Sequence, residues 1–407
     1  MKIYLPPTVK YIIKKIYEHN YEAYIVGGCV RDALLDVTPH DYDITTSAPP
    51  HVVLDIFKDF KCIETGIEHG TVSVLIDSNL YEITTYRIEG EYKDHRRPDS
   101  VDFTNKLEED LKRRDFTINA MAYNEKDNLI DLFGGKEDLK NKIIKTVGNP
   151  YDRFNEDGLR MIRAIRFSSK LNFLIEEETL QAIYNNAQII KNISLERITD
   201  EFTKIILSDK PENIVYLFKT KLLKYLDISN EENKEKIEDL YKKIGLLNEI
   251  DKDLTKRLAT LDYLIEALDI NCKSFCNSLI YSKKIIKNHN IILNCLKNTN
   301  IEELNKIEIK KILNKIEKNL FEQYLDISKV ICRNEKKINN IIDILKEIEE
   351  NNECYTIKNL KINGNDIIYL GYKNKEIGDI LNNLLEAVIV NPKLNNKELL
   401  IKKIKEI

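Results

Sequence analysis

The chain has 407 residues, more than a single hydrophobic core usually holds, so its length predicts two to four domains. Its 63 Lys and Arg and 67 Asp and Glu give a formal net charge of -4, which excludes binding of a polyanion by overall charge and leaves that task to local basic patches. The seven cysteines lack Cys-x-x-Cys spacing and no long apolar run occurs, which argues against a disulfide framework, a zinc site, a signal peptide or a membrane span and predicts a cytoplasmic protein.

The first informative segment is YIVGGCVRDALLDVTPHDYD, from Tyr24 to Asp43. It reads as an apolar strand that breaks at Gly27 and Gly28 and continues into a helix with Arg31 in its first turn. Paired glycines at a strand-to-helix turn let the backbone approach a phosphate, and the first N–H groups of the next helix favour an anion. Arg31 could add a charge-assisted contact to that anion.

The same segment ends in two carboxylates, Asp41 and Asp43. Residues i and i+2 of an extended strand project to one face, so both carboxylates could hold hard divalent cations against a substrate triphosphate. An isolated Asp-x-Asp is more often a pair of solvated side chains. The combination with the glycine turn and Arg31 favours a phosphoryl-transfer site.

Up to about residue 145, strand runs alternate with short helices and turn residues, which predicts an α+β head with a small mixed or antiparallel sheet. The predicted strands are YEAYIV (21–26), TVSVLID (71–77), LYEITTY (80–86) and NLIDLF (128–133). After the third of these runs lies YRIEGEYKDHRRP (86–98), in which charges alternate and Gly90 and Pro98 interrupt regular structure. Such charge-rich stretches are usually surface loops.

The segment EDGLRMIRAIRF covers residues 156–167. Asp157, Arg160, Arg163 and Arg166 recur at every third position, which places them along one face of a predicted helix. A carboxylate beside a guanidinium offers an acceptor next to a fork of donors, which suits the pairing edges of cytosine and adenine and not those of guanine and uracil. The alternative is a helix with an exposed i,i+3 ion pair. The predicted transfer site upstream favours base reading.

From Pro150 onward the pattern is helical, with amphipathic stretches at 180–193, 236–250 and 337–352. Together with the head this predicts an elongated α+β protein with an all-helical neck, body and tail. The predicted domains are a catalytic head (1–145), a neck for nucleotide selection (146–208), a helical body (209–350) and a helical tail (351–407).

These segments resemble the motifs of the class II tRNA nucleotidyltransferases, the CCA-adding enzymes, in their Gram-positive bacterial form within the polymerase-β-like nucleotidyltransferase superfamily. The resemblance is dense to about residue 205 and returns in the tail. The further pieces that carry it are GIEHGTVSV (66–74), EITTYRIEGEYKDHRRPDSVDF (82–103), LKRRDFTINAMAY (111–123), DLFGGKEDL (131–139), SLERITDEF (194–202) and INGNDIIYLGYKNKEIGDILNNLL (362–385).

The resemblance implies template-independent addition of the 3′-terminal CCA to tRNA, with the body (209–350) and tail (351–407) binding the tRNA. In that reaction the tRNA 3′-hydroxyl attacks the α-phosphorus of CTP or ATP, while Mg²⁺ activates the hydroxyl and neutralises the departing pyrophosphate. The residues that match the family's functional positions are Asp41 and Asp43 for catalysis and metal binding, and Gly28, Arg31, Arg114, Asp157, Arg160, Arg163 and Arg166 for the nucleotide.

Two further expectations follow from the resemblance. In the family, the loop within residues 82–103 helps reshape the site when the incoming base changes from C to A, so deletion of residues 89–97 should spare CC addition and block the final A. Gly158 stands where many relatives have proline, which loosens that turn without removing a functional group.

Two other functions compete with CCA addition. A bacterial poly(A) polymerase or A-adding enzyme belongs to the same superfamily, but the mixed charge of the tail (395–407) argues against the strongly basic tail of such polymerases. A noncatalytic RNA-binding protein on a decayed fold is less consistent with the intact Asp41, Asp43, Asp157 and Arg160.

Overall fold

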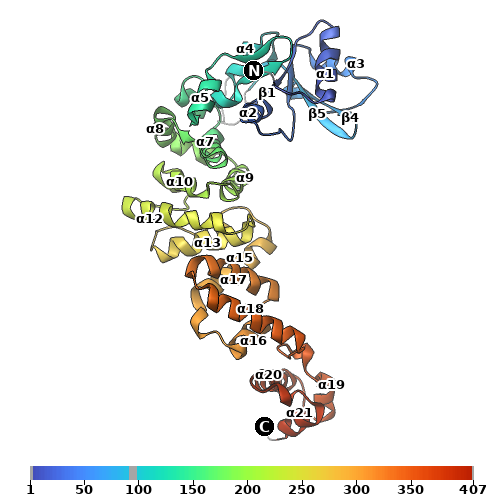
Figure 1. Ribbon diagram of the computed structural model, residues 1–407, viewed down its shortest axis with the longest axis vertical. Coiled ribbons are helices and arrows are strands. Elements are labelled where there is room, and N and C mark those ends of the chain that lie inside the picture. Colours follow the sequence, from blue (N-terminus) through green and yellow to red (C-terminus); the bar gives the residue numbers. More distant parts are fainter. Residues whose placement is uncertain (1–2, 91–98, 406–407) are drawn as a thin grey trace. The chain divides into compact units, whose positions relative to one another are not determined.

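The computed structural model describes residues 3–90 and 99–405 (Figure 1). The chain forms two compact units. One consists of Met1–Gly245 with Leu268–Ile280, and the other of Leu246–Ala267 with Tyr281–Ile407. The division into head, neck, body and tail stays a prediction.

The first unit contains a seven-stranded mixed sheet with the strand order β3-β4-β5-β2-β1-β8-β9. Among its described pairs, β2 and β5 run parallel and all the others antiparallel. The strands are β1 Ala23–Val26, β2 Ile44–Thr46, β3 Lys61–Gly66, β4 Thr71–Ile76, β5 Asn79–Thr85, β8 Met121–Asn124 and β9 Asn128–Asp131. The predicted α+β fold with a mixed sheet is confirmed, and the four predicted strand runs are β1, β4, β5 and β9.

Helices pack against the sheet, and its inner strand β1 is buried. Helix α1 (Pro7–Glu18) begins with proline at its first position, whose fixed φ suits a helix start, and buries residues at the helical spacing 9, 12, 13 and 16. It lies beside α3 (Pro50–Ile56) next to the sheet (Figure 1). All four residues of β1 are buried, so the core fixes the point at which β1 ends and the following turn begins.

The rest of the first unit is mostly helical and includes two small strand pairs. The antiparallel pair is β6 (Arg87–Glu89) with β7 (Val101–Phe103), and the parallel pair is β10 (Ile143–Ile144) with β11 (Leu174–Ile175). The helices are α2 Gly28–Leu34, α4 Leu107–Lys112, α5 Gly135–Asn141, α6 Pro150–Glu156, α7 Leu159–Leu171, α8 Glu177–Asn186, α9 Leu195–Ile206, α10 Val215–Lys219, α11 Leu222–Tyr225, α12 Lys234–Ile244 and α14 Phe275–Ser278. Short 3₁₀ turns are η1 Ile67–His69, η2 Thr117–Asn119, η3 Ala187–Asn192 and η4 Pro211–Ile214.

The described part of the second unit contains helices only. They are α13 Leu254–Ala267, α15 Lys283–Asn298, α16 Lys306–Lys315, α17 Lys318–Cys332, α18 Glu335–Glu350, α19 Gly364–Tyr369, α20 Lys375–Val390 and α21 Lys397–Ile404, with 3₁₀ turns η6 Ile301–Glu303, η7 Ile357–Asn359 and η8 Pro392–Leu394. Another 3₁₀ turn, η5 (Gly245–Glu249), begins at the last residue of one unit and continues into the other. Side chains of Asn305, Asn334 and Asn396 accept hydrogen bonds from the first N–H groups of three of these helices, which fixes where they begin.

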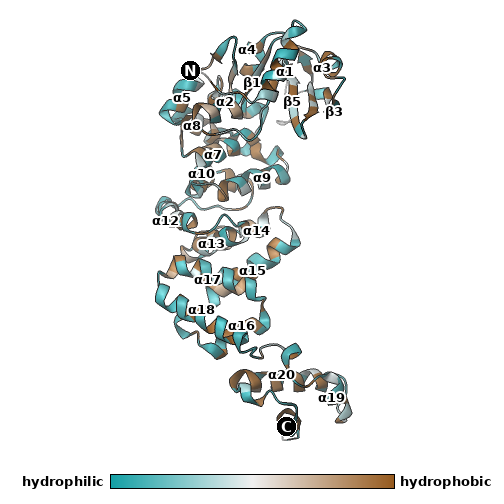
Figure 2. Cartoon of the chain, turned by 45° about the vertical axis from the view of Figure 1, so that its right-hand side comes forward, coloured by the Kyte–Doolittle hydropathy of each residue, from teal (hydrophilic) through white to brown (hydrophobic). Residues whose placement is uncertain are grey.

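The helices of the second unit carry hydrophobic and hydrophilic residues on different sides (Figure 2). Their apolar sides form one core around Ile309, Phe321 and Ile341 and another around Leu384 and Val388. The predicted amphipathic helix at 337–352 is α18, whereas those at 180–193 and 236–250 each end in a 3₁₀ turn. No helix of the described residues is long and apolar enough to cross a lipid bilayer.

Candidate active site

The turn after β1 brings an arginine against the backbone. Gly27 has φ +79° and ψ -128°, a conformation that side chains rarely adopt. A β-carbon on Gly27 would also lie 3.1 Å from Nη1 of Arg114. Glycine at this position therefore allows both the turn and the close approach of Arg114. Gly28, the first residue of α2, is less crowded, because a β-carbon there would make only an ordinary contact with Arg31.

Asp41 and Asp43 lie just before β2 rather than within it, and both are exposed. The backbone N–H of Val26 donates to the carbonyl of Asp43 at 3.0 Å, which holds Asp43 beside the end of β1. Protein atoms that crowd the Asp43 carboxyl raise its pKa, while Arg114 acts to lower it and Asp41 to raise it further. The two carboxylates thus repel each other next to the glycine turn, an arrangement that a divalent cation would stabilise.

Arg31 is almost fully buried, with 3% of its surface exposed. Its Nη1 donates to Oδ1 of Asn119 at 2.7 Å, and its Nε and Nη2 donate to Oδ1 of Asp32 at 2.8 and 2.7 Å. These bonds tie α2 to η2. The predicted contact of Arg31 with a triphosphate stays a prediction, and it requires the guanidinium to share or exchange these partners.

Asp115 connects this region to α7. Its Oδ1 accepts hydrogen bonds from Asn119 and from the Phe116 backbone, and its Oδ2 accepts from Nε and Nη2 of Arg163 at 3.0 and 2.6 Å. Burial acts to raise the pKa of Asp115, but the charge and hydrogen bonds of Arg163 hold it at about 2. Arg163 is therefore fixed by a carboxylate that stays ionised.

Arg166 is fixed in a similar way from another helix. Its Nε lies 2.5 Å from Oε2 of Glu201 on α9, and Nη1 of Arg163 lies 3.9 Å from the other oxygen of the same carboxylate. The sequence pattern identified these arginines but not Asp115, Asn119 or Glu201, because their interactions join positions far apart in the chain.

The predicted base-reading residues, Asp157 and Arg160, are held by different partners. Asp157 lies between α6 and α7 with extended backbone angles (φ -136°, ψ 106°), so it precedes the helix on which the sequence pattern placed it. Its carboxylate accepts hydrogen bonds from Arg197 of α9. Arg160 is 8% exposed and pairs with Glu156. It also donates to the carbonyl oxygens of Arg153 at 3.2 Å and Arg113 at 3.0 Å.

Gly158 is tightly packed. Its φ of -59° is one that proline also adopts, but a β-carbon would lie 2.9 Å from Cγ2 of Ile189. Glycine is therefore favoured here because a larger residue would collide with Ile189, and not because the backbone adopts an unusual conformation.

A cleft of about 420 Å³ collects several of these side chains. Its lining residues are His69, Arg87, Glu89, Val101, Arg113, Arg114, Asp115, Asp157, Leu159, Arg160, Arg163 and Arg197. The cleft thus unites four of the predicted residues: Arg114, Asp157, Arg160 and Arg163. Gly28, Arg31, Asp41, Asp43 and Arg166 are not among its lining residues, but Arg114 also touches the glycine turn next to Asp43.

Comparison with known proteins identifies the family. The family model "Poly A polymerase head domain" matches residues 23–145, and "Probable RNA and SrmB- binding site of polymerase A" matches residues 172–228. The CCA-adding enzyme of Ligilactobacillus salivarius (strain UCC118) is 38% identical over 97% of this chain and 95% of its own length. The chain belongs to the CCA-adding enzymes.

Other members of this family support the assignment. The CCA-adding enzyme of Enterococcus faecalis (strain ATCC 700802 / V583) is 54% identical over 48% of each chain. The crystal structure of the Bacillus stearothermophilus CCA-adding enzyme in complex with CTP superposes with a TM-score of 0.78 at 31% identity and covers 99% of both chains. The Thermotoga maritima CCA-adding enzyme complexed with tRNA shares the fold, with a TM-score of 0.65, 23% identity and full coverage of both chains.

In this CCA-adding enzyme the hairpin β6–β7 is anchored to the cleft. The carboxylate of Glu89 accepts hydrogen bonds from Arg87 at 3.0 Å and from Arg113 at 3.2 Å. The charged residues Glu91, Asp94, Arg96 and Arg97, which the sequence assigns to the switching loop, lie outside the described residues.

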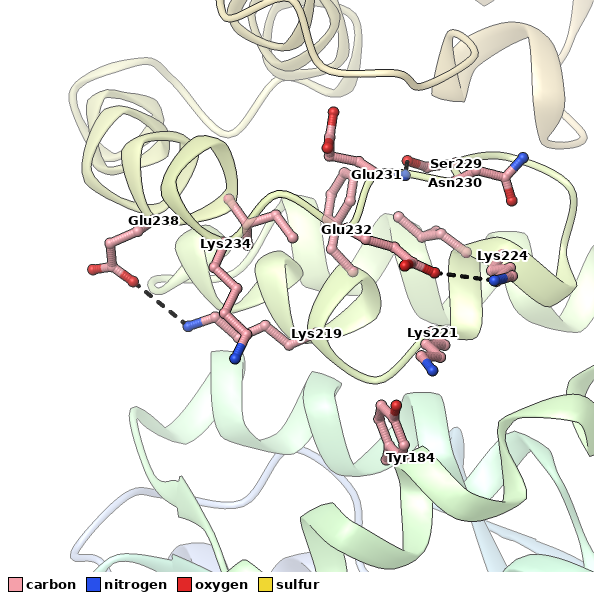
Figure 3. Close-up of a pocket in the computed structure, with 13 residues that line it drawn as sticks. Tyr184, Lys219, Lys221, Lys224, Ser229, Asn230, Glu231, Glu232, Lys234 and Glu238 are labelled. Carbon is pink, nitrogen blue, oxygen red and sulfur yellow. Dashed lines mark hydrogen bonds and ion pairs between the residues drawn. The ribbon is translucent and has the colours of Figure 1, made fainter.

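A second pocket of about 500 Å³ lies among residues 184–238 and contains none of the predicted site residues (Figure 3). Four lysines line it: Lys219, Lys221, Lys224 and Lys234. Lys221 points toward the ring of Tyr184, with Nζ 4.5 Å from the ring centroid (Figure 3). Lys219 and Lys224 pair with Glu238 and Glu232 at 3.7 and 3.0 Å, so the pocket has mixed charge.

Proposed function

We propose that this CCA-adding enzyme adds the 3′-terminal CCA to tRNA from CTP and ATP, and that the cleft lined by Asp157 and Arg160 selects the base. The observation that carries the proposal is the position of Arg114, which lines the cleft and also touches the glycine turn beside Asp43. One residue thus connects the base-reading side chains to the carboxylates. Among relatives of the same fold, solved structures contain CTP, ATP or a primer tRNA.

The family's reaction uses divalent metal ions, and Asp41 and Asp43 are suited to hold Mg²⁺. Both offer hard, exposed oxygen ligands. Crowding by protein atoms and, to a smaller extent, the charge of Asp41 raise the pKa of Asp43, and a cation would offset both effects. When bound, Mg²⁺ supplies activation of the tRNA 3′-hydroxyl and neutralises charge on the pyrophosphate. The two carboxylates set where the reacting phosphate lies, because the segment that carries them is held beside the end of β1.

The arginines are proposed to hold the nucleotide. Arg114 is positioned to contact phosphate oxygens at the glycine turn, because Gly27 leaves room for its guanidinium. Arg163 and Arg166 approach the nucleotide from α7, and their orientation is fixed by Asp115 and Glu201. The turn that precedes α2 is supported by Gly28, the first residue of that helix, and by the hydrogen bond between Arg31 and Asn119.

Base selection is assigned to Asp157 and Arg160. The side chain of Asp157 accepts a hydrogen bond from the amino group that cytosine and adenine share, and Arg160 donates to the adjacent ring nitrogen. Guanine and uracil present an acceptor beside a donor, so each would leave a buried partner unsatisfied. An unpaired polar group in a closed site costs on the order of 1–3 kcal/mol, enough to explain selection of C and A.

The decisive experiment substitutes Asp157 by alanine. We expect Asp157→Ala to reduce the preference for CTP over UTP and for ATP over GTP by about tenfold or more, measured as kcat/KM on truncated tRNA. Asp152→Ala removes an exposed carboxylate of α6 and should leave all four values unchanged. An unchanged four-nucleotide profile for Asp157→Ala would show that the base is read elsewhere.

The alternatives are less well supported. A poly(A) polymerase or A-adding enzyme would share the head, but a CCA-adding enzyme is similar along nearly the whole chain. Incubation of truncated tRNA with each labelled nucleotide separately distinguishes them, because only CCA addition incorporates both C and A. A cytoplasmic location remains part of the proposal, on the ground of the cysteine pattern.

A further inference from the structure

One side chain from a distant helix holds Asp157 in place. Arg197 lies in the first turn of α9, 40 residues along the chain from Asp157. Its Nη2 donates to Oδ2 of Asp157 at 2.8 Å and its Nη1 to Oδ1 at 3.4 Å. Both residues line the cleft in which we place the base.

The hydrogen bonds leave a defined free acceptor on Asp157. A carboxylate has about four acceptor positions, two on each oxygen. Oδ1 accepts from the backbone N–H of Leu159 at 3.0 Å and, at the longer distance, from Arg197. Oδ2 accepts the shorter bond from Arg197. The remaining position on Oδ2 is therefore the one available to an amino group, and Arg197 fixes its direction.

Asp157 needs such a partner because its own backbone does not fix its carboxylate. The residue lies outside α6 and α7, so helix packing does not restrict its side chain, and the terminal torsion of aspartate is broad. Without Arg197, the described hydrogen bond that would remain is the one from the backbone N–H of Leu159, which closes a local turn before α7. Its free lone pair could then point in several directions.

Helix α9 is well placed to orient the polar side of α7. The two helices pack together, and Ile198, Phe202 and Ile205 of α9 are buried. Arg197 and Glu201 lie four residues apart on α9, and Glu201 pairs with Arg166 of α7. The same helix thus supplies a guanidinium for the carboxylate of the base site and a carboxylate for its arginines.

We propose that Arg197 is a positioning residue for base specificity, which orients the Asp157 carboxylate as the acceptor for the amino group of C or A. This inference rests on the proposed function, in which Asp157 reads the base. Arg197 acts through Asp157 and need not touch the nucleotide itself.

The test compares four variants with the parent: Arg197→Ala, Arg197→Lys, Asp157→Ala and Asp157→Ala with Arg197→Ala. For each, kcat/KM is measured for CTP, UTP, ATP and GTP on truncated tRNA, and thermal unfolding checks the fold. We expect Arg197→Ala to lower the CTP/UTP and ATP/GTP ratios by about tenfold, because the acceptor loses its fixed direction. Arg197→Lys should recover part of the selectivity, since a lysine can make one of the two contacts.

The double variant adds a second criterion. If Arg197 acts through Asp157, removing both side chains should cost no more selectivity than Asp157→Ala alone. Asp200→Ala is the matched control, because it breaks an exposed ion pair of α9 with Lys204 and should leave both ratios unchanged.

Three results would overturn the inference or its basis. Equal loss of kcat/KM for all four nucleotides in Arg197→Ala, with unchanged ratios, would show a merely structural role. Loss of selectivity in Asp157→Ala together with parental ratios in Arg197→Ala and Arg197→Lys would refute the inference alone. A parental profile in Asp157→Ala would refute the proposed function instead. Should Arg197→Ala fail to fold, Arg197→Lys decides, because parental ratios in that variant contradict a two-contact role.

Discussion

Asp43 and Asp115 belong to the same unit, yet their surroundings shift their pKa values in opposite directions. Surrounding protein atoms that displace water act to raise the pKa of both, but only Asp115 has a paired arginine, Arg163, that outweighs this effect. A carboxylate already neutralised by arginine has little to offer a metal ion, whereas a crowded carboxylate beside another one gains from a cation. This contrast supports Asp43 as a ligand and Asp115 as a positioning group.

Substitution of either proposed metal ligand tests this assignment. Asp41→Ala or Asp43→Ala should abolish incorporation of both C and A, because loss of the metal removes several kcal/mol of transition-state stabilisation. tRNA affinity should stay within a few fold, since it depends on phosphate contacts spread over the protein. Nucleotide incorporation and tRNA binding are measured on the same preparations, and normal turnover by either variant would contradict the metal site.

The Asp115–Arg163 pair makes a pH-dependent contribution to stability. The pKa of Asp115 is about 2 in the folded protein and 3.8 as an ordinary carboxyl, so its contribution is fully present above about pH 4 and is lost as the pH falls toward 2. We expect Asp115→Asn to lower the free energy of unfolding at pH 7 by on the order of 2 kcal/mol.

Urea unfolding of parent and Asp115→Asn between pH 7 and pH 3 checks this expectation. The difference between the two proteins should shrink as the solution becomes more acidic. Asp152→Asn, at an exposed position of α6, serves as the control and should show no pH-dependent difference. If the difference in free energy of unfolding stayed constant across this range, the pKa of Asp115 would not be lowered in the folded protein.

At the scale of elements, the sequence predicted what depends on local pattern. Alternating apolar residues identified β1, β4, β5 and β9, and the glycines identified the turn before α2. The three-residue β2 and the polar edge strand β3 gave no such signal, because short or exposed strands lack alternation. The regular spacing from Asp157 to Arg166 predicted that all four residues lie on one helix. Asp157 instead has an extended conformation between α6 and α7, and the helix that carries the three arginines begins at Leu159.

The partners of the site residues were beyond prediction from the sequence alone. Arg197 and Asp157 are 40 residues apart, and Arg163 and Asp115 are 48 apart. No spacing rule relates such positions, because the packing of α7 against α9 and the contact of Phe167 with Phe116 bring them together. The residue types were therefore predictable and their pairing was not.

The hairpin β6–β7 sharpens the predicted effect of a loop deletion. Removal of residues 89–97 would also remove Glu89, which holds Arg87 and Arg113 at the cleft. Deletion of residues 91–97 alone should therefore spare CC addition and block the final A more cleanly. Product length on truncated tRNA, resolved to one nucleotide, gives the answer, and Glu89→Gln on the intact chain separates the anchor from the loop. Equal loss of C and A in the shorter deletion would make the segment a general structural element.

At the scale of the whole molecule, a chain of net charge -4 must bind an RNA through local groups of basic residues. The second pocket gathers four lysines, although Lys219 and Lys224 pair there with glutamates (Figure 3). We expect Lys221→Ala with Lys224→Ala to weaken tRNA binding without changing base choice. The slope of log affinity against log salt should become shallower by about 0.7–0.9 for each phosphate that the variant no longer neutralises. Lys58→Ala, an exposed lysine of the head, is the control, and an unchanged salt slope would remove this pocket from the RNA surface.

The order in which the chain visits the two units constrains how it folds during synthesis. The chain leaves the first unit after Gly245 and returns to it for Leu268–Ile280 before leaving again. Phe275, in the returning segment, stacks on Phe202 and meets the edge of Phe218. Phe202 and Phe218 lack this partner until the ribosome has added about thirty residues beyond Gly245, which takes seconds at ordinary elongation rates. For that interval the nascent first unit exposes part of its own core, which makes the returning segment, and not residue 245, the point at which this unit becomes complete.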